Sequence, residues 1–156
     1  MGGNIILTPA QILDLIPQQR PFRFVDEILE VDENHIVGRY TFRPDEFFYA
    51  GHFPGRPITP GVILLETMGQ IGIVALGIYL LCSDRPLEEI RRITTMFAEA
   101  TNVEFFRPVL PGETVVVRGE KVFWRRLKLR VNVQMTLADG TLVAHATAAG
   151  MGVRHD

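Results

Sequence analysis

The chain has 156 residues, of which 47% are hydrophobic and 22% are charged, and its 16 basic and 18 acidic residues give a net charge of −2. This length suits one domain, residues 1–156, that buries its own core, and the hydrophobic share excludes a disordered chain. The charge argues against nucleic-acid binding. The single cysteine, Cys82, excludes an internal disulfide or a zinc cluster and fits a reducing cytoplasm.

The first part of the chain predicts a short helix, a strand pair and a long loop. Residues 8–16 open on a Thr-Pro pair and suit a helix that ends before a second proline. Residues 22–31 and 35–42 suit two antiparallel strands joined by a short polar turn. The loop over residues 44–60 is rich in Phe, Gly and Pro, a composition that favours a fixed, packed loop.

The most hydrophobic stretch is residues 61–82, GVILLETMGQIGIVALGIYLLC, in which Glu66 is the only charged residue. It is long enough to cross a bilayer. A soluble helix buried on all sides is the better interpretation, because Pro60 and Gly61 start it as in soluble helices, with Thr59 as its N-cap. An acid inside the stretch would be costly in lipid, and no basic cluster flanks it. We therefore expect no stable membrane insertion.

From residue 87 onward the sequence predicts strands only. Residues 91–106 suit one long strand, bent or bulged, and residues 127–137 alternate strictly between apolar and polar side chains. Asp139-Gly140 predicts a hairpin turn, and small residues over 144–150 would let a helix approach the last strand closely. One long apolar helix with about six antiparallel strands predicts an α+β fold, in which a curved sheet wraps around the helix.

Two side chains are candidates for acid–base chemistry. Glu66, in an apolar helix, is expected to be desolvated with a raised pKa, and Gln70 lies on the same helix face and could orient it. The alternative is a structural acid paired with an arginine. His52 is the second candidate, although a histidine in a loop is most often only solvated or packed.

The tract between these two residues favours the catalytic interpretation. Residues 53–61 contain three prolines and two glycines and lead directly into a helix amino terminus. Free amides there suit a developing oxyanion. A base, an acid and an oxyanion site within one segment indicate proton abstraction next to a carbonyl group.

Residues 51–70, GHFPGRPITPGVILLETMGQ, resemble the active-site segment of the FabZ-type 3-hydroxyacyl-acyl carrier protein dehydratases, which have the hotdog fold. Weaker similarities lie at residues 21–26, PFRFVD, and at residues 105–113, FFRPVLPGE. The glutamate at position 66 resembles the FabZ type and not the FabA type, which has an aspartate there and also isomerises its product.

The resemblance implies dehydration of (3R)-3-hydroxyacyl thioesters on acyl carrier protein to trans-2-enoyl thioesters. No metal is expected, because His52 and Glu66 make at most two ligands, and no glycine-rich motif indicates a nucleotide cofactor. His52 would be the base and Glu66 the acid. The amide of Gly61 would hold the thioester oxygen, Gln70 would orient the acid, and the Ile58 carbonyl would accept from the histidine ring. The substrate-binding positions implied are Phe53, Pro54, Gly55, Ile58, Pro60, Met96 and Phe97. A homodimer with shared active sites, or a trimer of such dimers, is also implied.

Three departures from the family pattern bear on the substrate. Residues 18–20 read Gln-Gln-Arg where the family usually has His-Arg, Glu27 replaces an arginine, and Met96 lies near a position where the family often has a tyrosine. These differences suggest a specialised polyketide or polyene pathway instead of housekeeping fatty acid synthesis.

Arginines and a lysine near one strand could bind an acidic carrier protein. Arg125, Arg126, Lys128 and Arg130 cluster on and beside one polar strand face. The alternative is an ordinary solvated face. Two other function classes also remain at this stage: a hotdog acyl thioesterase, and a non-catalytic acyl-binding or assembly subunit.

Overall fold

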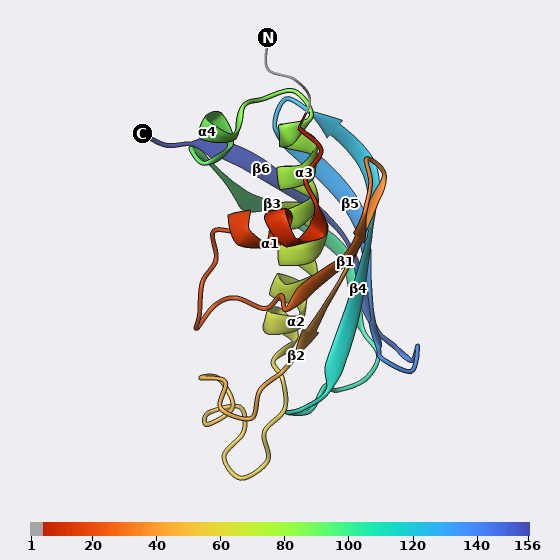
Figure 1. Ribbon diagram of the computed structural model, residues 1–156. Helices are drawn as coiled ribbons and strands as arrows, with labels where there is room; N and C mark the ends of the chain where they lie inside the picture. Colours follow the sequence, from red (N-terminus) through yellow and green to blue (C-terminus); the bar gives the residue numbers. More distant parts are fainter. Residues whose placement is uncertain (1–4) are drawn as a thin grey trace.

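The computed structural model describes residues 5–156, in which a curved antiparallel sheet wraps around one long helix (Figure 1). The six strands lie in the order β1-β2-β4-β5-β6-β3. Their bounds are β1 Glu27–Val31, β2 His35–Thr41, β3 Ile93–Phe105, β4 Thr114–Arg125, β5 Lys128–Leu137 and β6 Leu142–Arg154. The helices are α1 Pro9–Leu15, α2 Gly61–Gly69, α3 Leu76–Cys82 and α4 Leu87–Ile90, with a π-helical segment η1, Gln70–Ala75, between α2 and α3. The predicted α+β architecture is confirmed.

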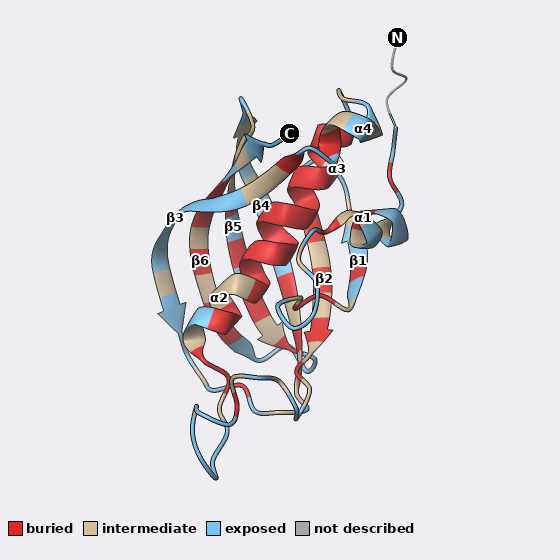
Figure 2. Ribbon diagram, turned by 90° about the vertical axis from the view of Figure 1, so that its left-hand side faces the viewer, coloured by how far each residue is buried: buried red, intermediate tan, exposed pale blue. Residues whose placement is uncertain are grey.

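The long helix lies against the concave face of the sheet with α1 packed beside it, and Figure 2 colours most of it as buried. By length and composition, Gly61–Cys82 could cross a membrane, but 78% of its most apolar window is buried inside the protein. Small residues allow the close contact: a Cβ atom at Gly150 of β6 would lie 2.2 Å from Cγ2 of Ile73. The predicted burial fails mainly in the first turns, where Val62 is 74% exposed and Glu66 is half-buried, and Tyr79 near the other end is also only partly buried.

Thr59 does not cap this helix, so that prediction is wrong. The N-cap position belongs to Pro60, and no side chain caps the helix there. The Thr59 hydroxyl instead lies 2.6 Å from the hydroxyl of Tyr49, and its N–H donates to the carbonyl of Val109 at 2.9 Å. Both bonds tie the end of the long loop to the core.

The predicted strand over residues 22–31 is correct only for β1. The Asp26 N–H still donates to the carbonyl of Arg39 on β2 at 2.9 Å. Before it, the Phe24 N–H donates to Oε1 of Gln70 at 2.7 Å, and the Phe22 carbonyl accepts from Nε2 of Gln70 at 2.9 Å. Residues 22–24 therefore attach to the central helix instead of pairing with a neighbouring strand.

Two further predictions in the second half need correction. Residues 87–90 form the short helix α4 and not a strand. Leu127 does not belong to the alternating strand, because it lies in the β4–β5 turn with φ +64°. The alternation itself is confirmed from Leu129 to Leu137, and so are the bulges in β3 and the turn at Gly140, which has φ +90°.

Candidate active site

The loop between β2 and α2 holds His52 by one hydrogen bond at its ring and one at its backbone carbonyl. Nδ1 lies 2.8 Å from the carbonyl oxygen of Ile58, and the Ile58 N–H donates back to the His52 carbonyl at 2.9 Å. Because a carbonyl only accepts, Nδ1 carries the proton, which leaves Nε2 as the acceptor of a neutral ring. The Phe53 ring stacks on the imidazole with 4.1 Å between centroids. The predicted contact between Ile58 and His52 is confirmed.

The loop is packed, as predicted, but its tip is exposed. Tyr49 is buried, and Phe48 lies against the aromatic cluster that includes Phe42. Pro54 and Gly55 are exposed, and Phe53 is 43% exposed. The side chains at the tip are therefore accessible to solvent.

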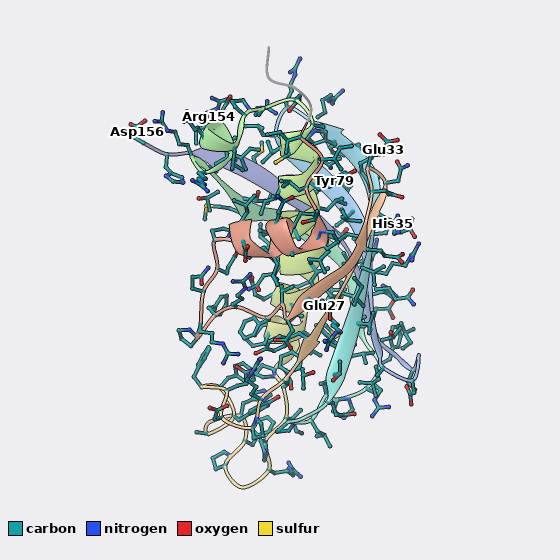
Figure 3. The ribbon with its side chains drawn as sticks, viewed as in Figure 1. Glu27, Glu33, His35, Tyr79, Arg154 and Asp156 are labelled. Atoms are coloured by element: carbon teal, nitrogen blue, oxygen red, sulfur yellow. The ribbon has the colours of Figure 1, made fainter. Side chains whose placement is uncertain are left out.

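His35 is a less suitable base, because its two ring nitrogens are already paired. They lie 2.8 Å from carboxylate oxygens of Glu30 and Asp32 at the β1–β2 turn, where Figure 3 labels His35 beside Glu33. The hydrogen bond to Glu30 raises the pKa of His35 and the one to Asp32 adds to this effect. These contacts describe a surface ion cluster.

Glu66 lies half-buried on α2, and burial raises its pKa above the ordinary value, with a smaller opposing effect from its hydrogen bond to Gln70. That bond runs from Nε2 of Gln70 to Oε2 of Glu66 at 2.9 Å. Within residues 5–156 no arginine lies within ion-pair distance of Glu66, so the alternative of an arginine-paired structural acid finds no support. The environment keeps the carboxyl protonated to higher pH than in water.

Gln70 is fully buried and connects the helix to residues far away in the sequence. Besides its bond to Glu66, Nε2 donates to the carbonyl of Phe22 at 2.9 Å, and Oε1 accepts from the Phe24 N–H. Both the amide nitrogen and the amide oxygen of Gln70 are therefore hydrogen-bonded. The predicted orienting contact between Gln70 and Glu66 is present.

A cavity of about 350 Å³ adjoins Glu66 between the helix and β3. Its wall consists of Gln18, Glu66, Gly69, Ile73, Val74, Thr94, Thr95, Met96 and Phe97. The predicted positions Met96 and Phe97 thus lie beside the acid. His52 does not line this cavity, and Phe53 and Gly55 border a separate surface hollow. The single chain therefore brings the acid, but not the histidine, to the cavity.

Gly61 begins α2, where the first backbone N–H groups of a helix lack partners within the helix. Among residues 5–156 the Gly61 N–H meets no acceptor. A Cβ at this position would lie 3.2 Å from the Phe105 ring, so the close approach of β3 favours glycine. The geometry leaves a free amide at the helix start, as the predicted oxyanion site requires.

The predicted docking residues flank the β4–β5 turn, but they are not equivalent. Arg125 ends β4, Arg126 has φ +52° in the turn, and Lys128 begins β5. Arg130 forms an ion pair with Glu99 on β3. Its charge is therefore already neutralised by a neighbour.

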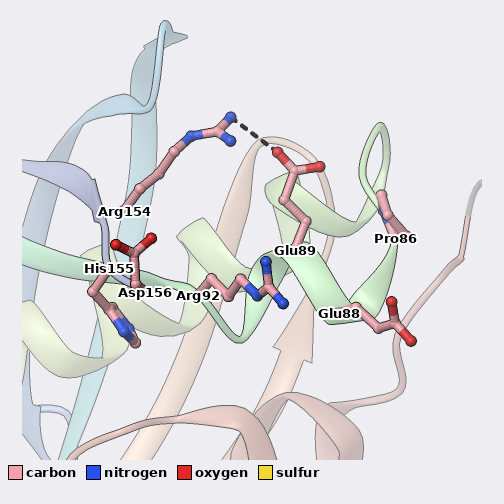
Figure 4. Close-up of a pocket in the computed structure, with 7 residues that line it drawn as sticks. All are labelled: Pro86, Glu88, Glu89, Arg92, Arg154, His155 and Asp156. Atoms are coloured by element: carbon pink, nitrogen blue, oxygen red, sulfur yellow. Dashed lines mark ion pairs between the residues drawn. The ribbon is translucent and has the colours of Figure 1, made fainter.

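Two features of the structure were not predicted from the sequence. One is a charged hollow of about 460 Å³ between α4 and the chain end, where Arg154 pairs with Glu89 at 2.9 Å (Figure 4). The other is the position of Gln18 in the wall of the Glu66 cavity. The sequence drew attention to Gln18 only because residues 18–20 depart from the usual family pattern. Within residues 5–156 no group of three His, Cys, Asp or Glu side chains is placed to hold a metal ion.

The chain is similar in sequence to known dehydratases. A family model described as a FabA-like domain matches residues 16–147. A 3-hydroxyacyl-[acyl-carrier-protein] dehydratase FabZ from Herpetosiphon aurantiacus is 36% identical over 140 residues, which are 89% of this chain and 93% of the relative. A FabZ from Proteus mirabilis is 40% identical over 129 residues, 81% of each chain.

Solved structures agree on the fold. The dehydratase heterocomplex ApeI:P from Xenorhabdus doucetiae has a TM-score of 0.74 at 12% identity and covers 96% of this chain and 93% of its own. A thioesterase from Haemophilus influenzae has a TM-score of 0.65 at 16% identity, covering 99% and 96%. At such identities the likeness extends to the hotdog fold alone. The sequence relatives, and not the structures, separate a dehydratase from a thioesterase.

Proposed function

Because the chain belongs to the FabZ-type family of 3-hydroxyacyl-acyl carrier protein dehydratases, we propose a reaction carried out by His52 and Glu66. The enzyme converts (3R)-3-hydroxyacyl thioesters on acyl carrier protein to trans-2-enoyl thioesters. The observation that carries the proposed roles is the half-buried Glu66 carboxyl, fixed by Gln70 in the wall of a largely apolar cavity.

The hydrogen bonds of His52 and Glu66 support a role for each group in the proposed reaction. Nε2 of His52 removes a proton from C2 of the substrate, while the Ile58 carbonyl holds the Nδ1 proton of the imidazolium that forms. The Gly61 amide donates to the thioester oxygen as negative charge develops on it. Glu66 gives its proton to the 3-hydroxyl, the C3–O bond breaks, and water leaves as the C2–C3 double bond forms. A return of the proton from His52 to Glu66 restores both groups.

We propose that the complete site needs two copies of the chain, so that the histidine of one copy meets the acid of the other. Two observations support this. His52 does not line the cavity of Glu66 in its own protomer. The edge strand β3 is largely exposed, including Met96, Phe97 and Phe105, and an exposed apolar edge strand favours pairing with another strand. The assembly is a homodimer or a trimer of such dimers.

Mixing two inactive variants tests the shared site. His52→Ala and Glu66→Ala are each expected to lower turnover by roughly 100- to 10,000-fold. In a mixed dimer of the two variants, one site contains both substitutions and the other contains neither. Mixing should therefore restore up to about a quarter of the wild-type activity, by random pairing of subunits. No recovery, with exchange of subunits verified by native mass spectrometry, would show that each chain holds its own site.

Arg125 and Arg126 are the proposed contacts for the acidic carrier. They lie at the β4–β5 turn, at the end of the molecule opposite the loop between β2 and α2 (Figure 1). Charge reversal at both arginines should raise KM for carrier-linked substrate and spare a small thioester mimic. Arg130→Gln is the matched control, because Arg130 is already paired with Glu99. Equal effects on both substrates would argue against docking here.

Mass spectrometry of 3-hydroxyacyl-carrier substrates of several chain lengths tests the activity itself. Loss of water with the product still attached to the carrier is the expected result. Release of a free carrier thiol would identify a thioesterase, and an unchanged substrate at every length would identify a non-catalytic acyl-binding subunit. The preferred length would distinguish fatty acid synthesis from a specialised polyketide or polyene pathway. We propose a cytoplasmic location, in keeping with a buried cysteine, Cys82, that is free.

A further inference from the structure

Gln18 places an unsatisfied amide beside the acid. It lines the same cavity as Glu66, and its Oε1 atom is buried without a hydrogen-bond partner. Among residues 5–156 it is the only buried side-chain nitrogen or oxygen atom in this state. Buried polar atoms almost always have partners, so an exception at the wall of an active-site cavity calls for a functional explanation.

Two nearby glutamines, Gln70 and Gln19, do form hydrogen bonds with their side chains. Gln70 uses both its amide nitrogen and its amide oxygen in hydrogen bonds. Gln19, one residue after Gln18, donates from Nε2 to the Ile16 carbonyl at 3.2 Å. Of these three glutamines, only Gln18 has a buried amide oxygen without a partner among residues 5–156.

The segment that carries Gln18 is fixed on both sides. Before it, α1 ends at Leu15, and the Leu13 carbonyl accepts a hydrogen bond from Arg23. After it, the carbonyl of Phe22 accepts from Gln70, the residue that also holds Glu66. Gln18 and Glu66 are thus positioned by one shared framework, which suits two groups that must bind one ligand together.

The two carboxyl oxygens of Glu66 differ in their hydrogen bonds. Its Oε2 atom accepts from Gln70, and its Oε1 atom has no partner among residues 5–156. The carboxyl proton therefore belongs on Oε1, where it can be donated to the leaving hydroxyl. That hydroxyl oxygen accepts from Glu66, and its own O–H needs a separate acceptor.

We propose that the amide oxygen of Gln18 accepts a hydrogen bond from the 3-hydroxyl group of the substrate. This inference rests on the proposed function and adds to it a residue that recognises the leaving group. The terminal torsion of a glutamine is soft, so the oxygen can turn from the wall toward an entering donor. As Glu66 protonates the substrate hydroxyl, the O–H of that hydroxyl becomes more acidic. Its hydrogen bond to the Gln18 amide oxygen therefore strengthens. The contact thus favours the transition state over the bound substrate.

Gln18→Met tests the inference, because methionine has a similar length and no amide. In a His52→Ala background, which slows turnover enough to measure binding, we would compare binding of 3-hydroxyacyl and saturated acyl N-acetylcysteamine thioesters of equal chain length. The variant should lose about tenfold in affinity for the hydroxylated ligand alone. In the active enzyme, kcat should fall more than KM rises. Gln19→Met is the matched control and should leave the preference for the hydroxyl unchanged.

Gln18→Met should weaken binding of the hydroxylated ligand but make the protein itself more stable, which thermal unfolding can measure. Removing an unsatisfied buried acceptor should raise the midpoint by about 2–4 °C in Gln18→Met. A lower midpoint, or an equal loss of affinity for both thioesters, would show that Gln18 is structural and would overturn the inference. Wild-type turnover reports separately on the dehydratase function: failure to form enoyl product would count against that function, while the binding ratio still decides the role of Gln18.

Discussion

Gly72 and Gly77 lie in one helix but face different surroundings, which allows the same substitution to be tested twice. A Cβ atom at Gly72 would lie 2.4 Å from Cγ1 of Val133 on β5. At Gly77 the nearest neighbours would be Oγ1 of Thr95 at 3.8 Å and Cδ2 of Leu129 at 3.9 Å, which are ordinary contacts. Alanine should therefore fit at Gly77 and collide at Gly72.

Two contributions determine how much alanine changes the free energy of unfolding at each position. In either position alanine improves helix propensity by about 0.8–1.0 kcal/mol over glycine. At Gly72 the new methyl group also overpacks a contact with Val133, which is 2% exposed and has little room to move, at a cost of about 1–3 kcal/mol. Gly77→Ala should thus stabilise the protein, and Gly72→Ala should be less stable than it by about 1–3 kcal/mol.

Thermal unfolding measures this difference, since each kcal/mol shifts the midpoint by about 2–4 °C in a chain of this size. All variants must be compared at one protein concentration, because assembly changes the midpoint. Adding Val133→Ala to Gly72→Ala should recover part of the loss, and the double-mutant cycle gives the coupling. If Gly72→Ala proved as stable as Gly77→Ala, the helix would not approach the sheet as closely as described.

Glu66→Gln should stabilise the protein above neutral pH but not near pH 4. Burial raises the pKa of Glu66 in the folded state, so the contribution of the protonated carboxyl to stability is lost as the pH rises through that pKa. Urea unfolding of wild type and variant, measured in parallel, should therefore diverge as the pH rises. Thr8→Ala removes half of a capping box with Gln11 and should cost about 1 kcal/mol in urea unfolding; no change would mean that α1 gains nothing from its cap. Tyr49→Phe leaves the buried Thr59 hydroxyl unpaired and should cost about 1–3 kcal/mol, an effect that Thr59→Val in the same background should reduce.

Local patterns predicted the parts of the fold that depend on neighbouring residues. The apolar run over residues 61–82, the alternation up to Leu137 and the turn at Gly140 all follow from spacing along the chain. The pairing of Glu66 with Gln70 does too, because residues four apart share a helix face.

Contacts between distant segments decided the features that the sequence could not reveal. Thr59 suits an N-cap, but its hydroxyl bonds to Tyr49 on the other side of the loop. Residues 22–24 suit a strand, but their backbone is held by Gln70, more than 40 residues away. The same anchorage brings Gln18 to the cavity, so no local pattern could have placed it there.

The π-helical segment Gln70–Ala75 fixes the exact length of the central helix. A π turn contains an extra residue, so the residues beyond it are rotated about the axis relative to an uninterrupted α-helix. Deleting one residue there would turn Leu76–Cys82 by about 100° relative to the half that carries Glu66. Either the acid would leave its cavity or the distal half would leave the core. The rotation of Leu76–Cys82 relative to the half that carries Glu66 therefore depends on the number of residues between them. A change in the length of this helix should disturb the protein more than most changes of residue type.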